Sequence, residues 1–316
     1  MIRFLDDSGA VGAGHHRCGW KYAMEQLVPL VSDDGVLLDD FVDKNFGWAP
    51  IRKPHQEPWI GVFHKPPNWP DWLGDQEKHN TPSRILTSPL FQESARHLRL
   101  AITFSKHLGD WLRDRIKSPV VTIPLPTTLP NLEFAPEHFT ANPEPAVVQV
   151  GYVLRNLRAI HQLNSPSPLK KVWIRIESES ARRYERQVGA YWDLTGPRPE
   201  YGDVHSNARL DNMSYDELLS RNIVFLELFD SSANNTIIEC IVRRTPLVVN
   251  RLPAIEEYLG ADYPLFYEDI SDADALLNDS VLFNAHKHLS EINVTAFSGE
   301  AFRRNVQNAI DENDVI

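Results

Sequence analysis

The chain has 316 residues, of which 32 are basic and 43 are acidic, so its formal net charge at neutral pH is −11. This acidic balance argues against a protein that binds duplex nucleic acid or is strongly attracted to an anionic membrane, since both require a basic face. The two cysteines, Cys18 and Cys240, are too few for a disulfide framework or a four-cysteine zinc site, which favours a reducing compartment.

No signal peptide and no run of about 18 apolar residues is found in the sequence. We therefore expect a cytoplasmic protein without a transmembrane segment, and only a peripheral contact with a membrane stays open. At this length two domains are expected.

Short apolar runs alternate with helical patterns along most of the chain. A proline-rich segment without periodicity, residues 124–145, resembles a linker between domains. Alternation of strands and helices predicts α/β domains with parallel sheets. The predicted strands are residues 1–5, 35–38, 59–63, 101–104, 120–123, 146–150, 171–176, 223–226, 245–249 and 264–267; the clearest helices are 20–30, 234–242 and 274–310, the last interrupted near Asn293.

The strongest local signal is residues 223–250, which read as strand, polar turn, helix and strand. Small polar residues at a helix start leave backbone N–H groups free, and with the helix dipole these can bind a diphosphate. Glu239 lies one helical turn further and could accept hydrogen bonds from a ribose. The alternative is an ordinary capped helix with an exposed glutamate. The turn residues are Ser231, Ser232, Asn234, Asn235 and Thr236.

Other candidate site residues also follow predicted strands, where ligands bind in such sheets. Gly151 would let the backbone approach a ligand, and Arg155 could reach a diphosphate, unless it is a surface arginine. His64, followed by two prolines and Asn68, could be a catalytic base or bind a sugar, or it could be structural.

A glycine-containing turn after the first strand includes Gly14, His15, His16 and Arg17, which could contact donor phosphate or acceptor. It lacks the G-x-G-x-x-G spacing of a dinucleotide site, so no such cofactor is expected. The adjacent histidines point apart and have no third ligand, so we expect no metal there. Asp272 and Asp274 match Asp-x-Asp formally but fit a helix start better than a metal site.

These motifs resemble GT-B fold glycosyltransferases, in particular the large retaining, nucleotide-sugar-dependent group. Thr245-Pro246 and the segment 253–260 follow in the same order as in that group. The chain is also similar to a smaller bacterial set with a His-x-Pro-Pro-Asn motif, here His64-Lys65-Pro66-Pro67-Asn68, and an Asn-Asn-Thr-Ile-Ile-Glu helix, here residues 234–239. The likeness covers nearly the whole chain.

The resemblance implies two Rossmann-like domains whose parallel sheets face a central cleft. Residues 1–145 would form an acceptor-side domain and 146–290 a nucleotide-sugar domain, while a helix in 291–316 would pack back toward the first. The implied activity is transfer of a sugar from a nucleoside diphosphate sugar to a hydroxyl of a glycan or small molecule, in bacterial surface polysaccharide or glycoconjugate synthesis. It would need no metal or other cofactor.

One departure from the group concerns its Glu-x7-Glu pattern, in which Glu239 matches the second glutamate and Ser231 replaces the first. The first glutamate usually faces the donor sugar. The resemblance favours a retaining mechanism, but this change leaves the sugar and the stereochemistry open. Two alternatives also stay open: a nucleotide-sugar epimerase of the same fold, and a sugar-binding subunit without catalysis.

Overall fold

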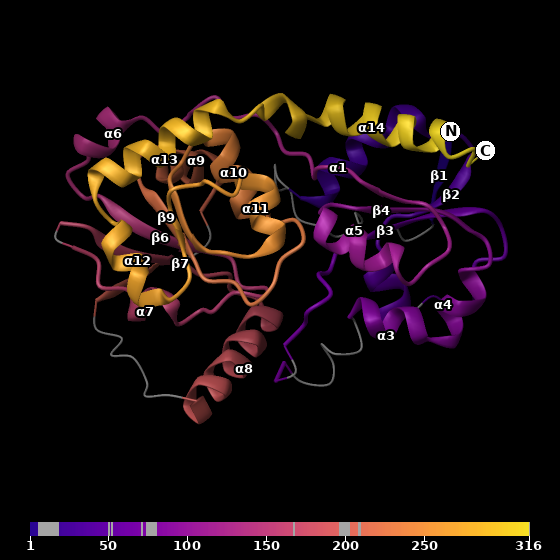
Figure 1. Cartoon of the computed structure of the whole chain (residues 1–316), viewed down its shortest axis with the longest axis horizontal. Helices are drawn as coiled ribbons and strands as arrows, with labels where there is room; N and C mark the ends of the chain where they lie inside the picture. The colour runs from indigo at the N-terminus through magenta and orange to yellow at the C-terminus, as the bar shows by residue number, and fades with distance from the viewer. Residues whose placement is uncertain are drawn as a thin grey trace. The chain divides into compact units, whose positions relative to one another are not determined.

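The computed structural model describes residues 1–5, 19–49, 51, 53–70, 72–73, 81–166, 168–195, 203–207 and 210–315. Two compact units are distinguished by their internal contacts. Unit 1 comprises Met1–Thr128, Asp230–Asn235 and Thr295–Ile316, and unit 2 comprises Leu129–Phe229 and Thr236–Val294. Figure 1 labels most of the helices and strands of both units.

Unit 1 contains a five-stranded parallel sheet in the order β1-β2-β3-β4-β5. All five residues of the central strand β3 are buried, as expected for a parallel strand with both faces covered. The strands are β1 (Ile2–Phe4), β2 (Val36–Asp39), β3 (Trp59–Phe63), β4 (Leu98–Thr103) and β5 (Val120–Thr122). The helices are α1 (Trp20–Leu27), η1 (Val28–Leu30), η2 (Lys44–Trp48), α3 (Pro82–Thr87), α4 (Pro89–Ser94), α5 (Lys106–Arg113) and α14 (Gly299–Glu312), with η3 (Val294–Phe297) leading into α14.

The C-terminal helix α14 packs against α1 within unit 1. Gly299 at its start lies directly against Gln26 of α1, because a Cβ built on Gly299 would be 2.3 Å from the Gln26 Oε1 atom. A side chain at position 299 would therefore force the Gln26 side chain to move.

Unit 2 contains a six-stranded parallel sheet in the order β11-β10-β9-β6-β7-β8. The strands are β6 (Ala146–Val150), β7 (Lys170–Ile174), β8 (Val204–Asn207), β9 (Ile223–Leu226), β10 (Leu247–Asn250) and β11 (Phe266–Tyr267). The helices are α6 (Pro136–Thr140), α7 (Ala159–Gln162), α8 (Glu179–Thr195), α9 (Asn212–Ser220), α10 (Asn235–Arg243), α11 (Pro253–Leu259), α12 (Ile270–Leu276) and α13 (Asp279–Glu291).

This strand order reverses direction between β6 and β9, which are neighbours in the sheet. Right-handed crossovers place α7 and α8 over one face and α9, α10 and α11 over the other. In a doubly wound sheet the ligand binds beyond the carboxyl ends of the strands at such a switch point. A ligand of unit 2 is therefore expected to contact the segments that follow β6 and β9.

The prediction of parallel α/β sheets is confirmed, and three strands, β3, β6 and β9, have the predicted bounds. The sequence did not predict strand β8. The region 274–310 contains a second break, since α12 ends at Leu276 and α13 begins at Asp279. Helix α12 begins at Ile270 and is capped by Asp269 with Asp272 as the reciprocal partner, so Asp272 serves a helix start.

No helix in the described part of the chain combines the length and apolar character that crossing a membrane requires.

Candidate functional site

The segments after β6 and β9 are fastened to each other at the switch point of unit 2. The Asn156 backbone N–H donates to the Glu227 carbonyl oxygen at 2.8 Å, and the Phe229 N–H donates to the Leu154 carbonyl oxygen at 2.9 Å. The chain turns back toward β9 after β6 at two residues with positive φ, Gly151 at 80° and Leu154 at 56°. Arg155 is consequently held beside the turn that follows β9.

Arg155 is buried, with 8% of its surface exposed, so the alternative of a surface arginine is wrong. Its Nη2 atom donates to the Thr236 Oγ1 atom at 3.1 Å, and Nη1 donates to the Val153 carbonyl oxygen at 3.0 Å. Burial lowers the pKa of Arg155, while Tyr215, Tyr184 and Glu239 oppose that shift. An arginine stays cationic at neutral pH. A positive charge therefore lies at the first turn of α10.

Glu239 lies one turn further along α10 and is 2% exposed, so the alternative of an exposed glutamate is wrong. Its Oε2 atom accepts a hydrogen bond from the Tyr215 hydroxyl of α9 at 3.0 Å. Burial, and then the charge of Glu239, raise the pKa of Tyr215 well above its ordinary value, so the phenol keeps its proton and remains the donor. Tyr215 thus fixes the Glu239 carboxylate.

The next turn of α10 is anchored to α9 by a buried ion pair. Arg243 donates from Nε and Nη2 to one Asp216 carboxylate oxygen, at 3.0 and 2.6 Å. Its Nη1 atom also donates to the Glu239 carbonyl oxygen at 3.3 Å. The side of α10 that carries Thr236 and Glu239 is therefore held in place by two residues of α9.

The long helix α8 holds the segment after β6, which contains Arg155 and Asn156. The Tyr184 hydroxyl donates to the Arg155 carbonyl oxygen at 3.4 Å, and the Trp192 indole N–H donates to the Asn156 Oδ1 atom at 2.9 Å. Asn156 in turn donates to the Glu227 carboxylate at 2.7 Å. Burial raises the pKa of Glu227, and the hydrogen bond from Asn156 opposes it.

Unit 2 therefore brings together Gly151, Arg155, Thr236 and Glu239 of the predicted residues. A cationic guanidinium at a helix N-terminus suits an anion, and a fixed carboxylate one turn further can accept hydrogen bonds from two hydroxyls. Sequence reasoning missed Tyr215, Tyr184 and Asp216, which come from other helices.

The remaining predicted turn residues belong to unit 1. Ser231 and Ser232 are buried, and the Ser232 hydroxyl is 3.1 Å from that of Ser105, the residue that caps α5. Asn234 is half-buried, and Asn235 is exposed as the first residue of α10.

Asp230 organises this part of unit 1, although sequence reasoning did not select it. It accepts hydrogen bonds from the backbone N–H of Asn68 at 2.8 Å and of Ser231 at 2.8 Å. The Nε2 atom of His107 lies 3.6 Å from the Oδ1 atom of Asp230. The available signal was that Asp230 lies in the turn that follows β9. Asp230 joins the predicted residue Asn68 to the serine turn.

His64 lies directly after β3 in unit 1, as predicted, and is half-buried among aromatic rings. Its ring centroid is 4.1 Å from that of Phe41 and 4.6 Å from that of Trp20. Burial lowers its pKa to about 4, so the ring is neutral at pH 7. A carbonyl only accepts, so Nε2 carries the proton that is donated to the Asp40 carbonyl oxygen at 2.9 Å. The basic nitrogen is then Nδ1.

Asp43 holds the start of the His64–Asn68 motif. Its carboxylate accepts from the backbone N–H groups of His64 at 2.7 Å and Lys65 at 3.3 Å. Burial raises the pKa of Asp43 to about 6, although these hydrogen bonds and the Lys65 charge oppose the shift. The predicted residues Gly14, His15, His16 and Arg17 lie outside the described residues. Across the described ranges, no group of three or more His, Cys, Asp or Glu residues is arranged to hold a metal ion.

Comparison with solved structures finds proteins of the same fold. HepE from Anabaena, solved with UDP and glucose, aligns with a TM-score of 0.62 at 9% identity over 81% of this chain and 72% of its own. Sucrose-phosphate synthase from Thermosynechococcus elongatus aligns with a TM-score of 0.56 at 14% identity over 80% of this chain and 67% of its own. The UDP-forming α,α-trehalose-phosphate synthase from Burkholderia vietnamiensis gives 0.55 at 12% identity over 93% and 76%.

No protein-family model and no curated protein sequence matches the chain. At these identities the structural likeness establishes the fold alone: two Rossmann-like α/β units, each with a parallel sheet, as in GT-B glycosyltransferases.

Proposed function

We propose that the protein is a glycosyltransferase that moves a sugar from a nucleoside diphosphate sugar to a hydroxyl of a glycan or small-molecule acceptor. The observation that carries the proposal is the grouping of Arg155, Thr236 and Glu239 at the switch point of unit 2. Uridine diphosphate is the proposed nucleotide, because HepE was solved with UDP and the trehalose-phosphate synthase is described as UDP-forming.

In this proposal Arg155 and the N-terminus of α10 stabilise the diphosphate as it leaves. The charge of the leaving group grows in the transition state, so a preorganised cation and helix dipole lower the barrier. Glu239, fixed by Tyr215, accepts hydrogen bonds from the ribose hydroxyls. No metal takes part in the proposed reaction, and a retaining outcome is favoured over an inverting one.

The first half of the chain is proposed to bind the acceptor, with His64 and Asn68 near the reacting carbon. A neutral His64 with its proton on Nε2 could act through Nδ1 as a base or as a hydrogen-bond acceptor for a sugar hydroxyl. We place the reaction in the cytoplasm, in bacterial surface polysaccharide or glycoconjugate synthesis.

The proposal is tested by calorimetric titration of the full chain with UDP in the presence of a chelator. We expect Glu239→Gln and Arg155→Gln each to raise the dissociation constant about tenfold or more, since each removes charge-assisted hydrogen bonds worth about 1.5–3 kcal/mol. The matched control is Glu268→Gln, because Glu268 is an exposed unit 2 carboxylate paired with Arg251.

Hydrolysis or transfer from UDP-sugars, measured by release of UDP, separates an enzyme from a binding protein. Binding of UDP that is equal in wild type, Glu239→Gln and Arg155→Gln would show that the nucleotide does not occupy this site.

A further inference from the structure

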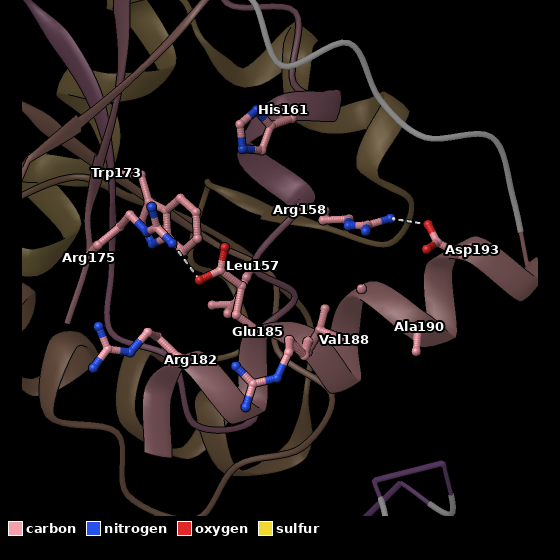
Figure 2. A pocket seen from close by; sticks show the side chains of 12 residues that line it. Leu157, Arg158, His161, Trp173, Arg175, Arg182, Glu185, Val188, Ala190 and Asp193 are labelled. Atoms are coloured by element: carbon pink, nitrogen blue, oxygen red, sulfur yellow. Dashed lines mark hydrogen bonds and ion pairs between the residues drawn. The ribbon is translucent and has the colours of Figure 1, made fainter. Parts of the chain in front are cut away.

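A concave pocket lies within unit 2, and none of the residues assigned to the nucleotide lines it. It is a pocket of about 550 Å³ between β7, α7 and α8, a size typical of small-molecule sites. Arg155, Thr236 and Glu239 are not among the residues that line this pocket. Figure 2 shows its walls, with Trp173 from β7, Arg175 directly after that strand, and a row of side chains from α8.

Four arginines line the pocket, and two of them have carboxylate partners. Arg175 pairs with Glu185 at 2.6 Å, and Arg158 pairs with Asp193 at 3.2 Å, as Figure 2 shows. The other two, Arg182 and Arg186, lie one turn apart on α8. No ion pair joins either of these to a residue in the described part of the chain. The pocket therefore carries two positive charges that its own carboxylates do not balance.

Trp173 supplies a second, independent indication of a ligand. It is 7% exposed, and the Arg175 guanidinium lies over its ring at 4.9 Å. Its indole N–H is buried and has no hydrogen-bond acceptor among the described residues. A buried donor left unpaired costs about 1–3 kcal/mol, which an oxygen atom of a ligand in the pocket would offset.

Gly189 shapes the wall between these groups. It faces the pocket from α8, and a Cβ built on it would lie 3.1 Å from the Arg158 Nη2 atom. The absence of a side chain thus lets the Arg158 guanidinium lie directly against the helix that carries Arg182 and Arg186.

We propose that this pocket binds a phosphate monoester of a small polar molecule. Such a group carries about −1.5 to −2 charges at pH 7, which matches the two unbalanced arginines. The planar guanidinium groups can each bind two phosphate oxygens, and the Trp173 N–H can donate to a further oxygen. The remaining volume accommodates the polar body of the ligand. The site is separate from the proposed nucleotide site and does not depend on glycosyl transfer.

The test is calorimetric titration of the full chain with glucose 6-phosphate, with glucose as the uncharged probe and inorganic phosphate as the minimal one. We expect glucose 6-phosphate and phosphate to bind and glucose not to bind. In the double variant Arg182→Gln/Arg186→Gln the dissociation constant of glucose 6-phosphate should rise at least about tenfold, since two charge-assisted contacts are lost. Arg183→Gln is the matched control, because Arg183 is exposed on the same helix but does not line the pocket.

A second measurement reports the position of the ligand. The Trp173 indole N–H resonance, identified by its loss in Trp173→Phe, should move as glucose 6-phosphate is added and should stay in place in the double variant. Equal binding by the wild type and the double variant, an unmoved Trp173 resonance, or equal binding of glucose would each overturn the proposal. None of these outcomes bears on UDP binding, which Glu239→Gln tests.

Discussion

Gly151 and Arg155 fit together so closely that a methyl group on the first would collide with the second. A Cβ built on Gly151 would lie 2.7 Å from the Arg155 Cζ atom and 2.9 Å from Nε and Nη2. The backbone of Gly151 also has a φ of 80°, which side-chain-bearing residues rarely adopt. The glycine therefore makes room for the guanidinium as well as turning the chain after β6.

We expect Gly151→Ala to weaken UDP binding at least about tenfold, because the guanidinium must leave its position beside Thr236. The left-handed backbone should in addition lower the free energy of unfolding by about 1–2 kcal/mol. Calorimetry with UDP and urea unfolding measure the two effects separately.

Gly260→Ala is the control for backbone strain. Gly260 has a nearly equal φ of 85°, but its Cβ would lie 3.5 Å from the nearest atom, His288 Nε2, which is ordinary contact. This variant should lose at least as much stability, because its ψ of 146° lies in a region that is essentially restricted to glycine, and it should bind UDP as the wild type does. If both variants bind UDP normally, Gly151 does not act through Arg155.

Tyr215→Phe should show whether UDP binding depends on the position of the Glu239 carboxylate, because it removes the hydroxyl that holds the carboxylate and leaves Glu239 itself in place. Removal of the hydroxyl leaves the buried carboxylate without that donor, which should lower the free energy of unfolding by about 1–3 kcal/mol. We expect UDP affinity to fall in Tyr215→Phe and not to fall further when Glu239→Gln is added, since both changes disable one carboxylate.

Tyr263→Phe provides the comparison for Tyr215→Phe, because the Tyr263 hydroxyl is also buried in unit 2 but bonds to the Leu247 backbone N–H. It should lose stability without losing UDP affinity. Additive losses of affinity in the double variant of Tyr215 and Glu239 would contradict the positioning role.

Arg243→Met should be the most destabilising of these changes. It removes one partner of a buried ion pair and leaves Asp216 without its cation, a loss of about 3–5 kcal/mol. The neighbouring Arg244 pairs with Glu133 at 2.7 Å, but both side chains are partly exposed. Arg244→Gln should therefore cost less than about 1 kcal/mol in urea unfolding. Similar losses in the two variants would show that the Arg243–Asp216 pair does not anchor α10.

Most of the fold could be predicted from the sequence, because buried parallel strands are continuous apolar runs. Residues 59–63, 146–150 and 223–226 show this, and each is a strand with those bounds. Strand β8 has no such run: its sequence is Val-His-Ser-Asn, and three of its four residues are exposed. Within the described part of the chain it pairs with β7 alone. Edge strands of this kind carry little hydrophobic signal.

The candidate site could be predicted only where local spacing specifies it. Arg155 follows the end of β6 closely, and Glu239 lies one turn after the start of α10, so their positions follow from the strand and helix assignments. Tyr215 reaches Glu239 from 24 residues away in the sequence, and Tyr184 reaches Arg155 from 29. Both tyrosines lie among the apolar residues of their helices, a pattern that indicates core packing and does not reveal the polar contact.

Asp43 and His64 should give unit 1 two opposing dependences of stability on pH. The folded-state pKa of Asp43 is raised to about 6 by burial, so its stabilising contribution is full below pH 3.8 and is lost as pH rises through 6. The folded-state pKa of His64 is lowered to about 4 by burial, so its contribution is full above pH 6.5 and is lost as pH falls through 4. Between pH 4 and 6 the two slopes oppose each other.

Single substitutions should expose each slope in urea unfolding measured from pH 4.5 to 7. Asp43→Asn keeps one oxygen that can accept from the His64 N–H group, gives up the acceptor of the longer Lys65 contact, and no longer titrates. Its stability relative to wild type should rise with pH, by about 2–3 kcal/mol over the whole titration, since each unit of pKa shift corresponds to about 1.4 kcal/mol. His64→Gln keeps a donor for the Asp40 carbonyl oxygen and should show the opposite trend, falling relative to wild type as pH rises. Parallel curves for the wild type and both variants would mean that neither group titrates differently in the folded and unfolded chains.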